Sequence, residues 1–397
     1  MLIKNASVLY GNELNYIQNT NIRISDNLFS KIGTNLKPLT KEETHDCEGL
    51  LMIPGFINAH THIGDSIAKD IGIDYGIEEK IHPVMGFKHK ILKNTESSHL
   101  TSFMRNSCIS MMKKGITTFI DFREGGLDGI LILKKAISNL PIRSIILGRI
   151  DYYQNTSSIK KNIPLSASKK KELTKLLEKC DGVGISGPNE NSNSVLRHYS
   201  QTKKIKAIHA AETIGSCEIS KKSTGKTETE RAMILKPNFL VHMTHASKHD
   251  LVLAAQNKIS IVVCPRANAS LADGIPNVHL MMKAGCNLAI GTDNVMINSP
   301  DMFREMDYLW KISMGMQKTR LSPKSILKMA SVNVSKMLKN KQLGTISPQS
   351  FADCIFIDKH AIDLEPMHNP HASIVHRASE STIKAVMIGG RIVHGKI

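Results

Sequence analysis

The sequence lacks several features that would each indicate a particular class of protein. It contains no run of about 18 apolar residues, the length a membrane-spanning helix needs, so we expect no membrane association. It has no C-x-x-C pair, and its seven cysteines are scattered and odd in number. This argues against a disulfide framework or a cysteine zinc site and favours a reducing compartment, the cytoplasm. The first residues, Met1–Asn5, also lack the apolar core and cleavage site of a signal peptide.

Aromatic residues are scarce, and basic residues outnumber acidic ones. Aromatics make up 5% of the chain, whereas 52 basic and 35 acidic residues give a net charge of +17. A strong positive charge can indicate nucleic-acid binding. Single strands, however, are held largely by stacking on aromatic side chains. The lysines lie in polar segments without aromatics, such as Lys169–Glu172 and Ser220–Lys222. The pattern favours a solvated lysine-rich surface over a nucleic-acid partner.

The middle of the chain alternates between β-branched strand candidates and helical patterns. The strand candidates are eight in number: Ile53–Ala59, Ile116–Asp121, Arg143–Arg149, Gly182–Ser186, Lys206–His209, Phe239–His242, Ser260–Cys264 and Leu288–Asp293. Helical patterns lie between most of them, for example Ser98–Lys114 and Ala167–Lys179. Strands that alternate with helices form a parallel sheet, and eight such units predict an α/β fold, the closed (β/α)8 TIM-like barrel.

Both ends of the chain carry short strand and turn signals. Ser7–Tyr10 and Asn21–Ile24 are strand candidates near the start, and Asp353–Asp358 and Ile383–Ile388 near the end. The pattern predicts two domains. Residues 1–52 and 347–397 would together form a small β-sandwich domain, and residues 53–346 would form the barrel domain.

Histidines gather at the carboxyl ends of the predicted strands. His60 and His62 are two residues apart on the first strand, so their side chains point to the same side. A catalytic zinc usually has three protein ligands and a water, so further ligands are expected. In such a barrel the active site forms where the strands end. The other polar side chains predicted there are His209, Glu212, His242, His245 and Asp293.

These motifs resemble the amidohydrolase superfamily. Pro54–His62, His209-x-x-Glu212, His242 and Gly291–Asp293 are similar to the branch that contains purine- and pyrimidine-type deaminases, adenosyl-compound deaminases and triazine chlorohydrolases. The likeness covers nearly the whole chain. It implies a hydrolase of carbon–nitrogen bonds, namely a metal-dependent deaminase that releases ammonia from an amino-substituted heterocycle or nucleoside. The alternative is another amidohydrolase, of cyclic amidase or chlorohydrolase type, that hydrolyses C–N or C–Cl bonds. A third possibility is a non-enzymatic binding protein, but the full set of predicted metal ligands argues against it.

The resemblance also implies a role for each motif residue. One divalent transition metal, Zn²⁺ before Fe²⁺ or Mn²⁺, would have as ligands His60, His62, His209 and Asp293. Such an ion lowers the pKa of its bound water towards about 7, and Asp293 would accept the water's proton. Glu212 would protonate the ring nitrogen, and His242 would hydrogen-bond the attacking oxygen. The fourth strand, Asp181–Gly187, lacks the lysine that bridges two metals in binuclear members, which favours one metal.

The expected substrate is a small heterocyclic molecule, and the sequence constrains its binding less. Residues 63–100 form a long segment expected to cover the barrel mouth. This segment has no tryptophan and matches the adenosyl-compound deaminases poorly. The segment Cys264–Leu271 resembles a family motif, which makes Arg266 and Asn268 candidate substrate-binding residues. The Arg/Glu pair within Asp121–Gly126 is a further candidate. By analogy with the family, we expect the chain to form a homodimer.

Overall fold

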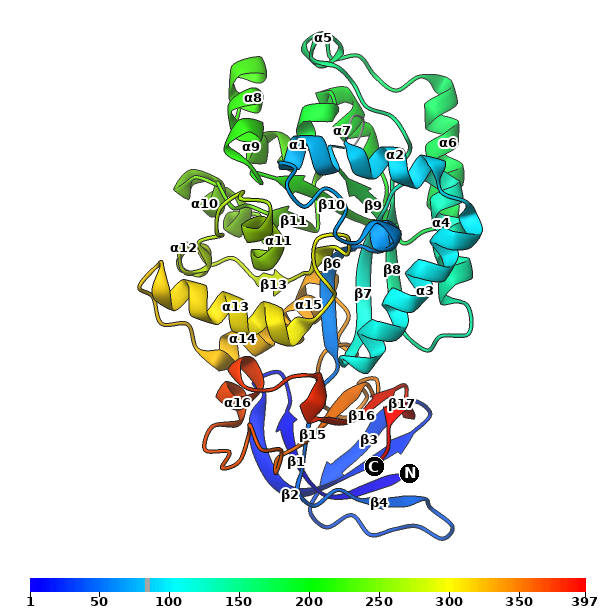
Figure 1. The fold of residues 1–397 in the computed structure, drawn as a ribbon, viewed down its shortest axis with the longest axis vertical. Helices are drawn as coiled ribbons and strands as arrows, with labels where there is room; N and C mark the ends of the chain where they lie inside the picture. The colour runs from blue at the N-terminus through cyan, green and yellow to red at the C-terminus, as the bar shows by residue number, and fades with distance from the viewer. Residues whose placement is uncertain (83–85) are drawn as a thin grey trace.

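Two β-sheets organise the structure, a computed structural model that describes residues 1–82 and 86–397 (Figure 1). The larger sheet has nine strands in the order β13-β12-β11-β10-β9-β8-β7-β6-β14, and every adjacent pair is parallel. Its strands are β6 (Phe56–His62), β7 (Ile116–Arg123), β8 (Arg143–Gly148), β9 (Gly182–Ile185), β10 (Ile205–Ala210), β11 (Phe239–His242), β12 (Ser260–Val263), β13 (Leu288–Ile290) and β14 (Asp293–Asn294).

The large sheet is curled. β14 follows β13 after two residues and pairs with β6, the first strand of the sheet in the sequence. Each of the eight predicted strands overlaps a strand of this sheet. The last is split into β13 and β14, and the first two residues of the predicted Ile53–Ala59 strand belong instead to β5 (Leu50–Pro54) of the smaller sheet. Gly291 lies at the split, where a Cβ would come within 2.7 Å of the His60 Cβ. This α/β arrangement is consistent with the predicted TIM-like barrel.

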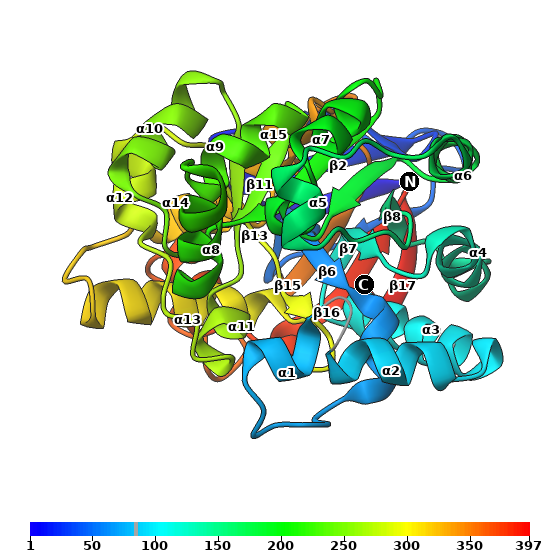
Figure 2. The same cartoon turned by 90° about the horizontal axis from the view of Figure 1, so that it is seen from above.

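Helices surround the curled sheet, as Figure 2 shows from above. The α-helices are α1 (Ile77–Ile81), α2 (Phe87–Asn94), α3 (Ser97–Lys113), α4 (Gly126–Ile137), α5 (Thr156–Lys160), α6 (Ala167–Glu178), α7 (Asn193–Ser200), α8 (Ile214–Thr224), α9 (Glu228–Ala232), α10 (Lys248–Gln256), α11 (Pro265–Ser270), α12 (Val278–Lys283), α13 (Met302–Gly315), α14 (Pro323–Met329), α15 (Val332–Leu338) and α16 (Pro370–His376). Short 3₁₀ helices are η1 (Ile63–Ala68), η2 (Pro188–Glu190), η3 (Met233–Leu235) and η4 (Glu380–Thr382).

Side chains of consecutive strand residues pack into two different buried apolar clusters. Ile57, Ile120 and Val241 belong to one buried cluster, while Phe56 and Phe119 join a second cluster that includes side chains of the helices. Alternation of this kind follows from the two-residue period of a strand. It leaves the strand ends free to present polar side chains. Within the described residues, no helix combines the length and apolar character that crossing a bilayer would require.

The smaller sheet contains strands from both ends of the chain. Its eight strands run in the order β17-β16-β15-β5-β1-β2-β3, with β4 paired to β1. Their bounds are β1 (Leu2–Tyr10), β2 (Asn15–Ser25), β3 (Leu28–Gly33), β4 (Thr44–Asp46), β5 (Leu50–Pro54), β15 (Cys354–Asp358), β16 (Ile383–Ile388) and β17 (Arg391–Gly395). Both termini therefore share one sheet, as expected. The described residues form it as a single sheet, so the predicted sandwich is not confirmed.

Candidate active site

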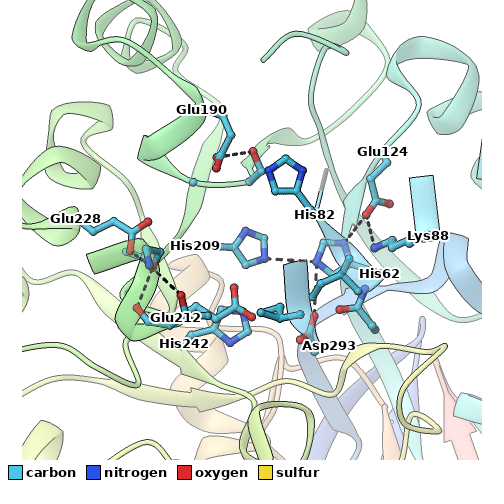
Figure 3. A pocket seen from close by; sticks show the side chains of 18 of the residues that line it. His62, His82, Lys88, Glu124, Glu190, His209, Glu212, Glu228, His242 and Asp293 are labelled. Atoms are coloured by element: carbon cyan, nitrogen blue, oxygen red, sulfur yellow. Dashed lines mark hydrogen bonds and ion pairs between the residues drawn. The ribbon is translucent and has the colours of Figure 1, made fainter. Parts of the chain in front are cut away.

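The four side chains predicted as metal ligands lie together at the carboxyl ends of β6 and β10 and in β14, and Figure 3 shows three of them, His62, His209 and Asp293. The Nε2 atom of His209 is 3.2 Å from Nε2 of His60 and 3.4 Å from Nε2 of His62. Asp293 Oδ1 lies 3.3 Å from Nε2 of His60 and 3.6 Å from Nε2 of His62. All four residues are buried. The strand ends thus bring three imidazoles and one carboxylate to a common point.

Hydrogen bonds fix which nitrogen of two histidines carries the proton. His62 Nδ1 faces the Phe122 carbonyl oxygen at 3.1 Å, and His209 Nδ1 faces that of Ile185 at 2.9 Å. Carbonyl oxygens only accept, so Nδ1 is the donor in both rings and Nε2 keeps its lone pair. Lone pairs that face one another at such short distances call for a cation between them. The donor set therefore fits a divalent transition metal.

Electrostatics hold these groups in the protonation states that ligands need. Burial lowers the pKa of His60 to about 3, and it lowers that of His209 well below its ordinary value, so both rings are neutral. Burial alone would raise the pKa of Asp293. Contacts with His60 and the other histidines outweigh burial and lower the pKa of Asp293, so the carboxyl group is ionised.

The backbone is strained at this centre. Ala211, His242 and Asp293 have φ angles of 51°, 71° and 60°, in the left-handed region that residues other than glycine seldom adopt. Such residues cluster at functional sites, where the surrounding structure holds them in place. Here the turns that leave β10 and β11 and the start of β14 aim side chains across the strand ends.

Glu212 and His242 form a second group beside the ligand cluster. His242 Nε2 is 3.3 Å from Glu212 Oε1, and the Asn268 side-chain amide lies 3.3–3.4 Å from His242 Nδ1. His242, His60 and Asp293 are also close enough to share an ion. Asn268, predicted to bind substrate, is fully buried and orients His242. His245 turns away, to the Asp273 carbonyl oxygen.

One cavity connects these groups. His62, His209, Glu212, His242 and Asp293 line it together with Ile77 and Ile81 of α1 and Lys88 of α2. Helices α1 and α2 of the predicted covering segment, residues 63–100, therefore line the cavity, and residues 83–85 of that segment lie outside the described residues. Three charged side chains that line this cavity were not predicted from the sequence: Lys88, Glu190 and Glu228. Burial raises the pKa of Glu228 to about 7. Glu124 also lines it and belongs to the Arg/Glu pair noted above.

Arg266, the other predicted substrate contact, has a protein partner. Its Nη1 lies 3.2 Å from Oε1 of Glu305, a fully buried side chain, and its Nη2 lies 3.2 Å from Oδ1 of Asn298. It is not among the residues that line the cavity described above. Burial raises the pKa of Glu305 from 4.5 to about 8, although the charge of Arg266 lowers it.

The pair predicts a pH-dependent stability. The pKa of Glu305 is raised in the folded state, so that state holds an extra proton between pH 4.5 and about 8, and stability falls as the pH rises through this window. Arg266→Met should cost little near pH 6, where Glu305 is protonated. At about pH 9, one unit above the pKa of about 8 for Glu305, the loss should be larger by up to about 1.4 kcal/mol, the free energy of one pKa unit. Urea unfolding at both pH values measures it, with the exposed Arg304→Met as control. Equal losses at both pH values would contradict this account.

Comparisons with known proteins agree with this α/β fold. The sequence profile of the amidohydrolase family matches residues 51–393. A protein of Methanothermobacter thermautotrophicus, provisionally named an aminohydrolase, is 35% identical over 99% of both chains. The 5-methylthioadenosine/S-adenosylhomocysteine deaminase of Thermococcus sibiricus is 29% identical, over 99% of this chain and 93% of the relative.

A solved structure shares the fold. The zinc-bound adenosine deaminase of Xanthomonas campestris superposes with a TM-score of 0.84 at 19% identity, over 98% of this chain and 92% of that one. At this identity the likeness shows the fold alone. The profile match and the 35% relative show the family. The chain belongs to the amidohydrolase family, and it is a hydrolase that acts on carbon–nitrogen bonds.

Proposed function

We propose that this protein is a hydrolytic deaminase that removes ammonia from an amino-substituted heterocycle or nucleoside. One observation carries the proposal. The Glu212 carboxyl group lies in the same cavity as the candidate ligands but contacts His242, so it is placed to serve as an acid beside the metal centre. The names of relatives, including the Thermococcus deaminase, support the same reaction class.

The proposed cofactor is one divalent ion, Zn²⁺ before Fe²⁺ or Mn²⁺, with His60, His62, His209 and Asp293 as ligands. The facing Nε2 lone pairs fit such an ion, and the zinc in the Xanthomonas structure supports the choice of metal. β9 contains no lysine, which argues for one ion rather than two. The bound ion would supply the nucleophile by lowering the pKa of a water.

Side chains of the protein carry out the remaining steps, which are proton transfers and hydrogen bonding. Asp293, held ionised, accepts the proton of the attacking water. Glu212 delivers a proton to the ring nitrogen, which would otherwise carry the developing negative charge. It then takes the remaining proton of the attacking water and delivers it to the departing amine, and the proton held by Asp293 restores the acid form of Glu212. His242 donates a hydrogen bond to the attacking oxygen, and Asn268 orients its ring.

The test is ammonia release from a panel of amino-heterocycles and nucleosides, read by enzyme-coupled ammonia detection on metal-loaded protein. The panel includes chloro-substituted and cyclic amide compounds, which the alternative amidohydrolase activities would hydrolyse. We expect ammonia from at least one amino compound, about one metal ion per chain by elemental analysis, and no turnover after chelation. Chloride release or ring opening without ammonia would replace the deaminase proposal with the alternative.

We further propose the organisation around this site. Residues 53–346 would be the closed (β/α)8 barrel domain, and residues 1–52 and 347–397 the small β-sandwich domain. Apolar side chains exposed near α12 and α13, Met282, Met314 and Met316 among them, support a homodimer, which light scattering would test. Seven free cysteines support a reducing, cytoplasmic location.

A further inference from the structure

A buried charge network joins helix α2 to the ligand His62. Glu124 Oε1 lies 2.9 Å from His62 Nδ1 and 2.6 Å from Lys88 Nζ (Figure 3). Lys88 comes from α2 and is 6% exposed, and its Nζ also lies 3.4 Å from Asp65 Oδ2. The other Glu124 oxygen, Oε2, pairs with Arg123 Nη2 at 2.6 Å. Residues from β6, β7 and α2 thus meet around one carboxylate.

Both central charges are maintained despite burial. Burial alone would raise the pKa of Glu124, but the charge of Lys88 outweighs burial and lowers it, so the carboxyl group is ionised. Burial alone would lower the pKa of Lys88, yet Glu124 and Asp65 raise it. A buried lysine is rare unless it is paired. Lys88 therefore docks α2 onto the strand ends by satisfying two carboxylates at once.

The network continues to the other ligand strand. Asp65 Oδ2 accepts a hydrogen bond of 2.7 Å from Asn294, the residue after Asp293, and its Oδ1 accepts one of 3.1 Å from the Met296 amide. Lys88 is thus linked through Glu124 to His62 and through Asp65 to β14. His62 Nδ1 lies between Glu124 Oε1 and the Phe122 carbonyl oxygen, and acceptors placed in this way fix the ring of a metal-binding histidine and make it a better ligand.

We infer that Glu124 is a positioning residue for His62, and that Lys88 couples the docking of α2 to metal binding. The inference rests on the proposed metal site but not on the substrate. Coupling between two events is reciprocal. Removal of Lys88 should weaken metal binding, and bound metal should in turn stabilise α2.

The experiment measures the Zn²⁺ dissociation constant by competition with a chromophoric chelator. Glu124→Gln and Lys88→Met should each weaken binding by about 10–100-fold, the usual cost of losing a partner of a metal ligand. Lys90→Met is the matched control, because Lys90 is exposed on the same helix. Amide hydrogen exchange in α2 should slow when Zn²⁺ binds to wild type, and the slowing should be lost in Lys88→Met.

A double variant separates coupling from damage to the fold. Each single variant leaves the charge of the other residue without its partner. The double variant, Glu124→Gln with Lys88→Met, removes both charges together. If the two residues act as one unit, the double variant binds Zn²⁺ no more weakly than the single variant with the lower affinity. If each substitution damages the site independently, the two losses of binding free energy add. Additive losses, or single variants that bind Zn²⁺ like Lys90→Met, overturn the inference. If wild type binds no divalent metal at all, the proposed function fails and the inference fails with it.

Discussion

Glu212→Gln should abolish most turnover while the protein keeps its metal. Glu212 is proposed to protonate the ring nitrogen and then the leaving amine, and glutamine can donate a hydrogen bond but no proton. Removing a general acid costs about 10²–10⁴-fold in rate, and the loss should lie at the upper end because one carboxyl group serves both steps. The carboxyl group lies 3.3 Å from His242 Nε2 and does not belong to the candidate ligand groups, so metal content should stay unchanged. Steady-state rates and elemental analysis of the same preparation measure both.

The matched control is Glu218→Gln, on the exposed face of α8 a few residues further along. It makes the same chemical change outside the cavity and should leave kcat and KM unchanged. In Glu212→Gln, KM should move less than kcat, because glutamine preserves the shape of the side chain. If Glu212→Gln keeps a rate close to that of wild type, well short of the about 10²-fold loss expected of a general acid, the reaction needs no ring protonation. A hydrolase of the alternative type would then be the better interpretation.

Local sequence signals predict the strands and the ligand cluster because both depend on short-range geometry. A strand places residues of equal parity on one side, and parallel strands end at one edge. Motifs far apart in the chain, such as His60–His62 and Asp293, were therefore expected to meet. The split of the last strand carries no such signal. It depends on the contact of Gly291 with His60, more than 200 residues away in the sequence.

The side chains that complete the cavity depend on tertiary contacts, which a sequence pattern does not reveal. Lys88 resembles the many surface lysines behind the net charge of +17, and its burial follows only from the positions of Glu124 and Asp65. Residues 63–100 were expected as a covering segment. Their helices α1 and α2 have only five and eight residues, too short for a clear helical period. Arg266 suggested an anionic ligand, but Glu305, 39 residues further on, is its partner.

Asp293→Asn should differ from Glu212→Gln, because this change affects both the metal and the proton acceptor. Asp293 Oδ1 lies 3.3 Å from His60 Nε2, within the ligand cluster, and the carboxyl group is held ionised. An amide can neither take the water's proton nor neutralise the charge of the ion. The rate should fall by at least about 10³-fold, within the range for loss of a positioned base. Zn²⁺ affinity should fall as well, which chelator competition measures alongside kcat.

Asparagine is the informative replacement because the backbone accepts it. Asp293 has a φ of 60°, and asparagine adopts this left-handed conformation more readily than most residues, so the fold should survive. Asp307→Asn on α13 controls for the loss of one carboxylate, since Asp307 pairs only with Lys311 at the surface in the described contacts and should leave rate and affinity unchanged. If Asp293→Asn binds Zn²⁺ like wild type but loses turnover, Asp293 is a base and not a ligand. If it keeps both, the proposed site is wrong, because no other carboxylate belongs to the candidate ligand groups found among residues 1–82 and 86–397.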